Sequence, residues 1–206
     1  MIKEISKIKK ECPVCEIERD LIYGEMNEVL KVRGEDIEVT SRVHYCTEGK
    51  HYFYDVEDEE EKFQIAYREY RKRKGFLQPE EIKKIREQYG LSQKNFARLL
   101  GWGDITIHRY ESGAIQDEAH NVVLSLMKDF DYYKQYFETR KNTLDPVLAR
   151  KIEDKINHRT IELLIRLFSA KREESNEPIT SATMPTYSEQ NNALKYCTNE
   201  ELALAA

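Results

Sequence analysis

Two cysteines on a tight turn near the N-terminus are the feature that most restricts how this chain folds. Cys12-Pro13-Val14-Cys15 places two thiols three residues apart, on a turn that the proline helps to pre-set. Such a pair fills half of a tetrahedral zinc site, so a second pair must come from elsewhere in the chain. Cys46 and His51 are predicted to supply it. The result is a closed Cys3His site of the structural kind, which folds a small domain and leaves no position for chemistry.

Two alternatives to this ligand set are open. His44 competes with His51 for the fourth position, and the cysteines are otherwise ordinary core residues without a metal. The N-terminus lacks an apolar export signal, so we expect a reducing cytoplasm, where metal ligands or plain thiols are favoured over disulfides. Cys197, in a polar segment, is predicted to be a free thiol.

The chain separates by composition and pattern into five regions: 1–55, 56–75, 76–128, 129–172 and 173–206. In the first, the alternating apolar residues Ile37, Val39 and Val43 predict a β-hairpin that turns at 33–36 and returns Cys46 to the first cysteine pair. The second predicts a charged connecting helix. The third and fourth predict short helices, and the fifth is expected to be disordered. The predicted fold class is therefore mainly α with a small N-terminal β-rich zinc domain.

Charge is segregated along the chain, and this keeps nucleic acid among the expected partners. The whole chain carries −5, but residues 62–111 hold twelve basic and six acidic residues, a local charge of +6. A polyanion responds to the local patch and not to the sum. No stretch reaches the length of apolar sequence that a bilayer span needs, so no membrane partner is predicted.

The segment 91–113 carries the pattern of a helix-turn-helix bundle. Ala97 is small where two helices cross, Gly101 provides the turn, and Ile107 anchors the following helix. In such motifs the second helix enters the major groove of double-stranded DNA while the first crosses the phosphates. The residues left on the free face of the second helix are Ile105, Thr106, His108 and Arg109.

The DNA-binding roles follow from side-chain chemistry. Arg109 is the strongest base-reading candidate because a guanidinium pairs bidentately with guanine O6 and N7. Gln93 begins the preceding helix and is expected to bond a phosphate. Lys94 and the basic run 71–74 are expected to add attraction that is independent of sequence. The alternative is an ordinary helical bundle whose basic residues only keep it soluble.

The order of these motifs resembles the MqsA-type antitoxins of bacterial and phage toxin–antitoxin systems. The shared pattern is a Cys-Pro-x-Cys zinc domain, a Tyr- and Arg-rich connector, and Leu-Ser-Gln…Phe-Ala…Leu-Gly…Thr-Ile…Arg-Tyr-Glu-x-Gly, over roughly residues 10–130. The resemblance implies an Xre/Cro-like helix-turn-helix, a homodimer formed through the C-terminal domains, a palindromic operator and autoregulation. It also implies a toxin partner for the zinc domain.

The sequence departs from the family pattern at three places. The second knuckle, Cys46-Thr47-Glu48-Gly49, lacks the second cysteine of Cys-x-x-Cys. Arg109 matches the base-reading arginine of the family, but Ile105 stands where the family has asparagine, which predicts a different operator. Residues 129–206 extend past the type member.

The predicted function is a sequence-specific DNA-binding repressor that acts as an antitoxin, autoregulates its operon and neutralises a toxin. The predicted location is the cytoplasm, in association with the nucleoid. The alternative is a stand-alone zinc-containing regulator with no toxin. An enzyme is not predicted, because we find no Gly-rich phosphate loop and no nucleophile–base arrangement, and His108 and His120 fit helix surfaces.

The last four residues, Ala203-Leu204-Ala205-Ala206, resemble the end of the tag that bacterial tmRNA adds to stalled proteins, which the ClpXP protease reads. On a disordered tail this end predicts a short-lived protein. The alternatives are a chance ending and a cloned tag.

Overall fold

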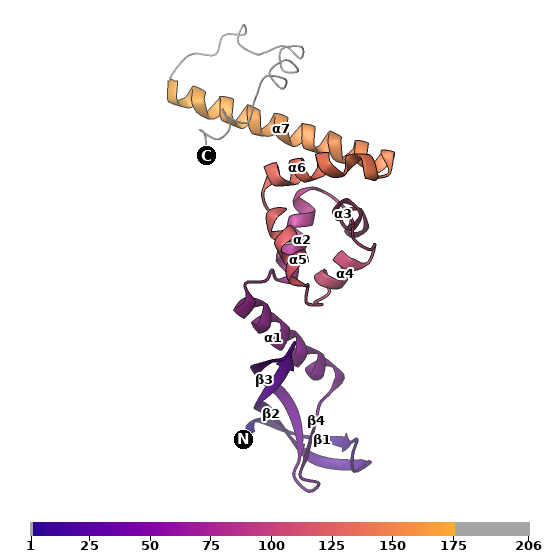
Figure 1. Cartoon of the computed structure of the whole chain (residues 1–206). Coiled ribbons are helices and arrows are strands. Elements are labelled where there is room, and N and C mark those ends of the chain that lie inside the picture. Colours follow the sequence, from indigo (N-terminus) through magenta and orange to yellow (C-terminus); the bar gives the residue numbers. More distant parts are fainter. Residues whose placement is uncertain (1, 176–206) are drawn as a thin grey trace. The chain divides into compact units, whose positions relative to one another are not determined.

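The computed structural model describes residues 2–175, as an N-terminal antiparallel sheet followed by helices (Figure 1). The contacts between residues divide the chain after Lys155. The predicted order, a small β-rich part and then a helical part, is confirmed. None of the described helices is long and apolar enough to cross a membrane.

Four strands, β1 (Lys3–Cys12), β2 (Ile17–Val32), β3 (Glu35–Cys46) and β4 (His51–Phe53), form a meander in which each strand pairs antiparallel with the next. The predicted hairpin is β2–β3. Its turn residues, Arg33 and Gly34, have φ of 49° and 89°, the left-handed conformations that suit a two-residue hairpin loop. The sequence pattern predicts neither β1 nor β4, because β1 is rich in lysine and β4 is only three residues long.

Helix α1 (Val56–Lys74) covers one face of β2 and β3 (Figure 1). The predicted alternation along β3 is confirmed, since its buried residues pack with those of the helix. Gly75 ends α1 in the left-handed conformation, as expected for a glycine at that position. The core between sheet and helix consists of Val32, Ile37, Val39, Ala66 and Tyr70.

Six further α-helices follow within the described residues: α2 (Pro79–Gln88), α3 (Gln93–Leu100), α4 (Thr106–Glu111), α5 (Glu118–Leu126), α6 (Phe130–Arg140) and α7 (Pro146–Ser175), with a short 3-10 helix, Lys141–Thr143, before α7. The predicted start of α3 is confirmed by its cap, because Ser92 Oγ accepts from the Asn95 amide at 3.2 Å. α5 begins in the same way, with Asp117 accepting from the His120 amide at 2.8 Å.

α4 begins at Thr106, and the carboxylate of the preceding Asp104 pairs with Arg98 at 2.9 Å and Lys94 at 3.3 Å. One boundary differs from the sequence expectations. α7 continues to Ser175, past the predicted start of the tail. The rest of that tail, with Cys197 and the last four residues, lies outside the described residues.

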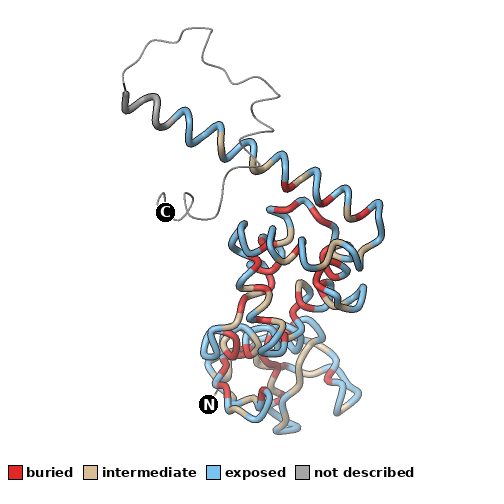
Figure 2. The backbone as a smooth tube through the Cα atoms, turned by 45° about the horizontal axis from the view of Figure 1, so that its top comes forward, coloured by how far each residue is buried: buried red, intermediate tan, exposed pale blue. Residues whose placement is uncertain are grey.

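Buried residues are distributed over both the sheet and the helices (Figure 2). In the helical part, Phe96, Ala97, Leu99 and Ile107 are fully buried, and α3 packs against α4. The side chains of Arg86 and Glu111 form a nearly buried ion pair at 2.6 Å, which ties α2 to the end of α4. α4 is short, and its position therefore depends on these contacts with its neighbours.

Candidate metal centre and nucleic-acid interface

Two turns of the same form bring the cysteines together. Cys12 ends β1 and Cys46 ends β3, and in both turns the cysteine carbonyl accepts a hydrogen bond from the amide four residues later. These bonds, from Glu16 and from Lys50, are both 2.8 Å long. Both donor residues also have a positive φ, 58° and 53°. The chain thus builds two equivalent knuckles from sequences that share only their first cysteine.

The ligand atoms of Cys12, Cys15, Cys46 and His51 lie within 4.8 Å of one another, and this set is called the cysteine cluster below. Cys12 and Cys46 are fully buried against Leu21, and all three cysteines are free thiols. Three soft sulfur donors and one imidazole are the donor set of a structural zinc site. The cluster is close enough to hold a metal ion, as predicted.

Gly49 explains how the second knuckle works without its second cysteine. A Cβ atom at this position would collide with the His51 ring, lying 2.6 Å from Nδ1, and would stand 3.1 Å from Cys15 Sγ. The space that a side chain at position 49 would fill is therefore taken by the imidazole. His51 Nε2 lies 2.9 Å from Cys12 Sγ, and Nδ1 lies 3.1 Å from the Gly49 carbonyl oxygen. A proton on Nδ1 donated to that carbonyl leaves Nε2 free to ligate.

His44, the competing ligand, lies away from the cysteine cluster. Its Nε2 is 3.0 Å from Asp55 Oδ2, and it forms a second group of ligand-type side chains with Asp55 and Asp58. Lys10 pairs with Asp55 at 2.6 Å and Arg42 with Asp58 at 3.2 Å. Those cations already neutralise the carboxylates, so the charge in this group is balanced without a metal.

The thiols of the cluster differ in acidity. Burial raises the pKa of Cys12, but the hydrogen bond with His51 and backbone hydrogen bonds from Cys15 and Val14 outweigh it and bring the pKa to about 6. Burial and the neighbouring sulfurs raise the pKa of Cys15. The hydrogen bond with Cys12 raises the pKa of His51. One thiolate is therefore present near neutral pH before a cation arrives, and a metal would displace the remaining protons.

The second candidate site is the exposed side of α4, called the α4 face below and made of Ile105, Thr106, His108 and Arg109. Ile105, His108 and Arg109 are exposed and Thr106 is half-buried, whereas Ile107 and Tyr110 point inward. Among the described residues, no hydrogen bond or ion pair holds the Arg109 side chain. The four predicted residues thus lie together on the solvent side of a firmly anchored helix.

Gln93 and Lys94, predicted to contact phosphate, lie at the start of α3. The Gln93 side-chain amide donates to Glu111 at 2.7 Å, within the contacts that hold the end of α4. Lys94 is exposed, and its ammonium group lies 3.3 Å from Asp104. The two residues are near the α4 face, but each already has a partner within the chain.

Three of the four basic residues at the end of α1 have partners within the chain. Arg71 is fully buried and donates to the Gly113 carbonyl oxygen at 2.5 Å. Arg73 bonds Glu69, and Lys74 pairs with Glu35 at the start of β3. The prediction that the whole run attracts nucleic acid is therefore wrong for Arg71, whose guanidinium group has no access to a phosphate. A row of four basic residues does not reveal from sequence which one is buried.

In this fold a sheet with a cysteine cluster, β1 to α1 and called the sheet domain, is followed by the helices α2 to α6, called the helical domain, one of which exposes a polar face. The family model described as the antitoxin component of the bacterial toxin–antitoxin system, MqsA, matches residues 10–138. This chain belongs to the MqsA antitoxin family. The match runs from within β1 to within α6 and implies a role other than catalysis. A search of curated proteins gives no match.

Proposed function

We propose that this chain is the antitoxin of a toxin–antitoxin pair and represses its own operon by binding operator DNA. Family membership supports the antitoxin role. The observation that carries the DNA-binding role is the α4 face, which points to solvent while Ile107 and the Arg86–Glu111 pair fix the helix from behind.

In this proposal α3, the Gly101 turn and α4 form an Xre/Cro-like helix-turn-helix. α4 enters the major groove with Arg109 paired to a guanine, while Thr106 and His108 contact base edges or phosphates. Ile105 offers an apolar contact, which suits a thymine methyl group. Gln93 and Lys94 bind phosphates from the start of α3, with Lys94 leaving Asp104 for the polyanion.

The cysteine cluster is proposed to hold a structural Zn²⁺ through Cys12, Cys15, Cys46 and His51. The ion would join the two knuckles and supply folding energy, and the four ligands leave no position for a substrate. Zinc fits because three thiols and an imidazole converge, with a carbonyl acceptor behind the imidazole.

The proposal is completed by a homodimer formed through the C-terminal helical domain and by a toxin bound at the zinc domain. Both come from the family resemblance. Recognition of residues 203–206 by ClpXP and a position at the nucleoid in the cytoplasm belong to the same proposal.

DNA binding is tested with a duplex from the promoter immediately upstream of the coding gene. Arg109→Ala should cost about 1–3 kcal/mol of binding free energy and relax the preference at one base pair. Lys94→Ala should weaken all sequences alike and lower the salt slope by ~1. If neither variant changes the affinity of a duplex that the wild type binds, α4 is not the reading helix.

The antitoxin role is tested by expressing the neighbouring gene alone and then with this chain. Growth arrest that co-expression relieves is the expected result. Promoter binding without any arrest would support the alternative, a stand-alone regulator.

A further inference from the structure

The segment that follows α4 is embedded in the N-terminal sheet domain. α4 ends at Glu111, and the next residues, Gly113 to Gln116, run against α1 and the β2–β3 turn. Ile115 packs against the core cluster between sheet and α1. Ile115, which follows α4 closely in the chain, thus helps to complete the core of the sheet domain. The few residues between the end of α4 and Ile115 do not form a free linker.

Arg33, at the turn between β2 and β3, fixes this segment from the sheet side. Its two terminal nitrogens donate to consecutive carbonyl oxygens, of Ile115 at 2.6 Å and of Gln116 at 2.8 Å. The turn residue adopts a left-handed φ of 49°, as the two-residue hairpin loop requires. A planar guanidinium group matches two adjacent acceptors in a way that an ammonium group does not.

Arg71 fixes the same segment from α1. It donates to the Gly113 carbonyl oxygen at 2.5 Å, and its Nε lies 3.5 Å from Gln116 Oε1. Gln116 is itself fully buried and donates to the Leu77 carbonyl oxygen at 2.8 Å. Among the described residues no carboxylate forms an ion pair with Arg71. A buried charge held by neutral oxygens is costly, so its burial indicates a specific structural role.

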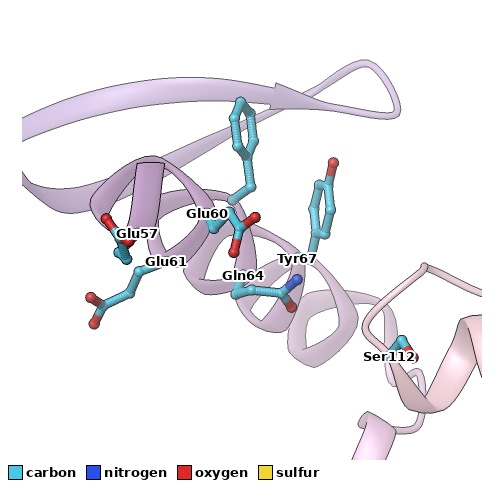
Figure 3. Close-up of a pocket in the computed structure, with 7 residues that line it drawn as sticks. Glu57, Glu60, Glu61, Gln64, Tyr67 and Ser112 are labelled. Atoms are coloured by element: carbon cyan, nitrogen blue, oxygen red, sulfur yellow. The ribbon is translucent and has the colours of Figure 1, made fainter. Parts of the chain in front are cut away.

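The seam between α1 and the end of α4 is visible in Figure 3. Ser112 lies across from the α1 side chains Gln64 and Tyr67, and the two elements border an open groove of about 580 Å³. Acidic side chains of α1, Glu57, Glu60 and Glu61, line the same groove, so it offers no attraction to DNA. Near α4, the two arginines donate hydrogen bonds across the seam, and Ile115 and Gln64 pack beside them.

We propose that Arg33 and Arg71 are positioning residues that fix the orientation of α4 relative to the sheet domain. They are called the arginine clamp below. The inference rests on the proposed binding of DNA by the α4 face. It goes beyond that proposal, because residues far from the α4 face would set how well α4 fits the major groove of DNA. The sheet domain and the reading helix move as one body.

The first test needs no DNA. ¹⁵N relaxation of the full chain gives a rotational correlation time for the sheet domain and for the helical domain separately. The wild type should give one common value, and Arg33→Ala should make the two values diverge. The clamp would be overturned if the two correlation times already differ in the wild type. It would also be overturned if they stay equal in both Arg33→Ala and Arg71→Lys.

The second test measures affinity for the promoter duplex. Arg33→Ala and Arg33→Lys should both weaken binding by about tenfold with an unchanged salt slope, because the lysine keeps the charge but lacks the fork. The matched control is Lys31→Ala, which removes an exposed charge from the same hairpin and should leave affinity unchanged.

The outcomes separate the clamp from the proposed function. Wild-type affinity in Arg33→Lys, or a salt slope lowered by ~1 in Arg33→Ala, would mean that Arg33 acts only as a charge near DNA. If the wild type binds no promoter duplex, the proposed DNA binding is wrong, and so is the role of the clamp in positioning α4 for DNA. The relaxation experiment would still decide whether the clamp joins the two domains. Zinc content and the melting temperature of each variant show that the fold is kept.

Discussion

The cysteine cluster and the helical domain obtain their order in opposite ways. Around the cluster the fully buried residues are few, Cys12, Leu21 and Cys46, and two of them are ligand candidates. The helical domain buries large apolar side chains such as Phe96 and Ile107 and caps its helices locally. The region around the cysteine cluster therefore directs its candidate ligands inward, to a metal ion that would hold the region together. The helical domain keeps the residues of the α4 face on the outside of a helix, and apolar packing holds that helix in place.

Removing the metal should have the largest effect on stability, and it should affect the cysteine cluster but not the helical domain. Cys12→Ser should abolish binding of about one zinc per chain and unfold the two knuckles, since a structural zinc supplies on the order of 10 kcal/mol at neutral pH. The helical domain should keep its helices. Metal analysis and amide hydrogen exchange check both parts, and Cys197→Ser is the control that leaves the cluster intact. Full protection of the knuckles in zinc-free Cys12→Ser would contradict the comparison.

A cavity in the helical domain should have the reverse effect. Ile107→Ala removes a fully buried side chain and should lower the free energy of unfolding by about 2–5 kcal/mol. Zinc content should stay unchanged. Ile107→Val, a smaller truncation at the same site, should cost about 0.5–1.5 kcal/mol. Denaturant unfolding, followed by the circular dichroism of the helices, measures the stability of both variants. Loss of zinc in either variant would show that the cysteine cluster depends on the packing of the helical domain.

The fourth ligand gives a sharper comparison within the sheet domain. Gly49→Ala should displace the His51 ring and weaken zinc binding by about 10- to 100-fold, as loss of a ligand's supporting contacts typically does. Thr47→Ala, exposed in the same turn, is the control. The double variant Gly49→Cys with His51→Ala exchanges the imidazole for a thiolate and should retain zinc. Competition with a chelator measures all three, and wild-type affinity in Gly49→Ala would remove His51 from the ligand set.

The smallest effect concerns acid stability of the helical domain. The backbone hydrogen bond from Gln78 lowers the pKa of Glu81, outweighing burial, and Lys128 lowers it further. A lowered pKa adds stability that is present above the unfolded pKa of about 4.3 and is lost as the pH falls through the folded value. Glu81→Ala should therefore cost about 0.5–1 kcal/mol at pH 7, given its exposure, and nothing at the acid end. If Glu81→Ala lowered the free energy of unfolding equally at pH 7 and at acid pH, the lowered pKa of Glu81 would not contribute to stability.

Much of the fold follows from local signals in the sequence. Ser92 and Asp117 start helices through bonds to amides three residues away, and Gly75 ends one through its backbone freedom. Such interactions are set by neighbours in the chain. β1 is rich in lysine and β4 has only three residues, so neither carries an alternating apolar pattern that would predict a strand.

The candidate sites show the same limit. Cysteine spacing predicts the cluster. The choice of His51 over His44 depends on the missing side chain at Gly49, whose place the His51 ring takes, and on the contact of His44 with Asp55, which only the folded chain shows. Likewise the pattern predicts which side of α4 is exposed. It does not show that Arg71 is buried, because burial there depends on a loop more than forty positions along the chain.

The central claim is that the α4 face reads DNA, and an NMR titration tests it most directly. The ¹⁵N-labelled full chain is titrated with the upstream promoter duplex and with a scrambled duplex of equal length. The account predicts that the promoter duplex shifts the amide signals of 105–109 and of Gln93 and Lys94, and leaves those of the cysteine cluster in place. Shifts confined to the sheet domain, or identical shifts with both duplexes, would contradict it.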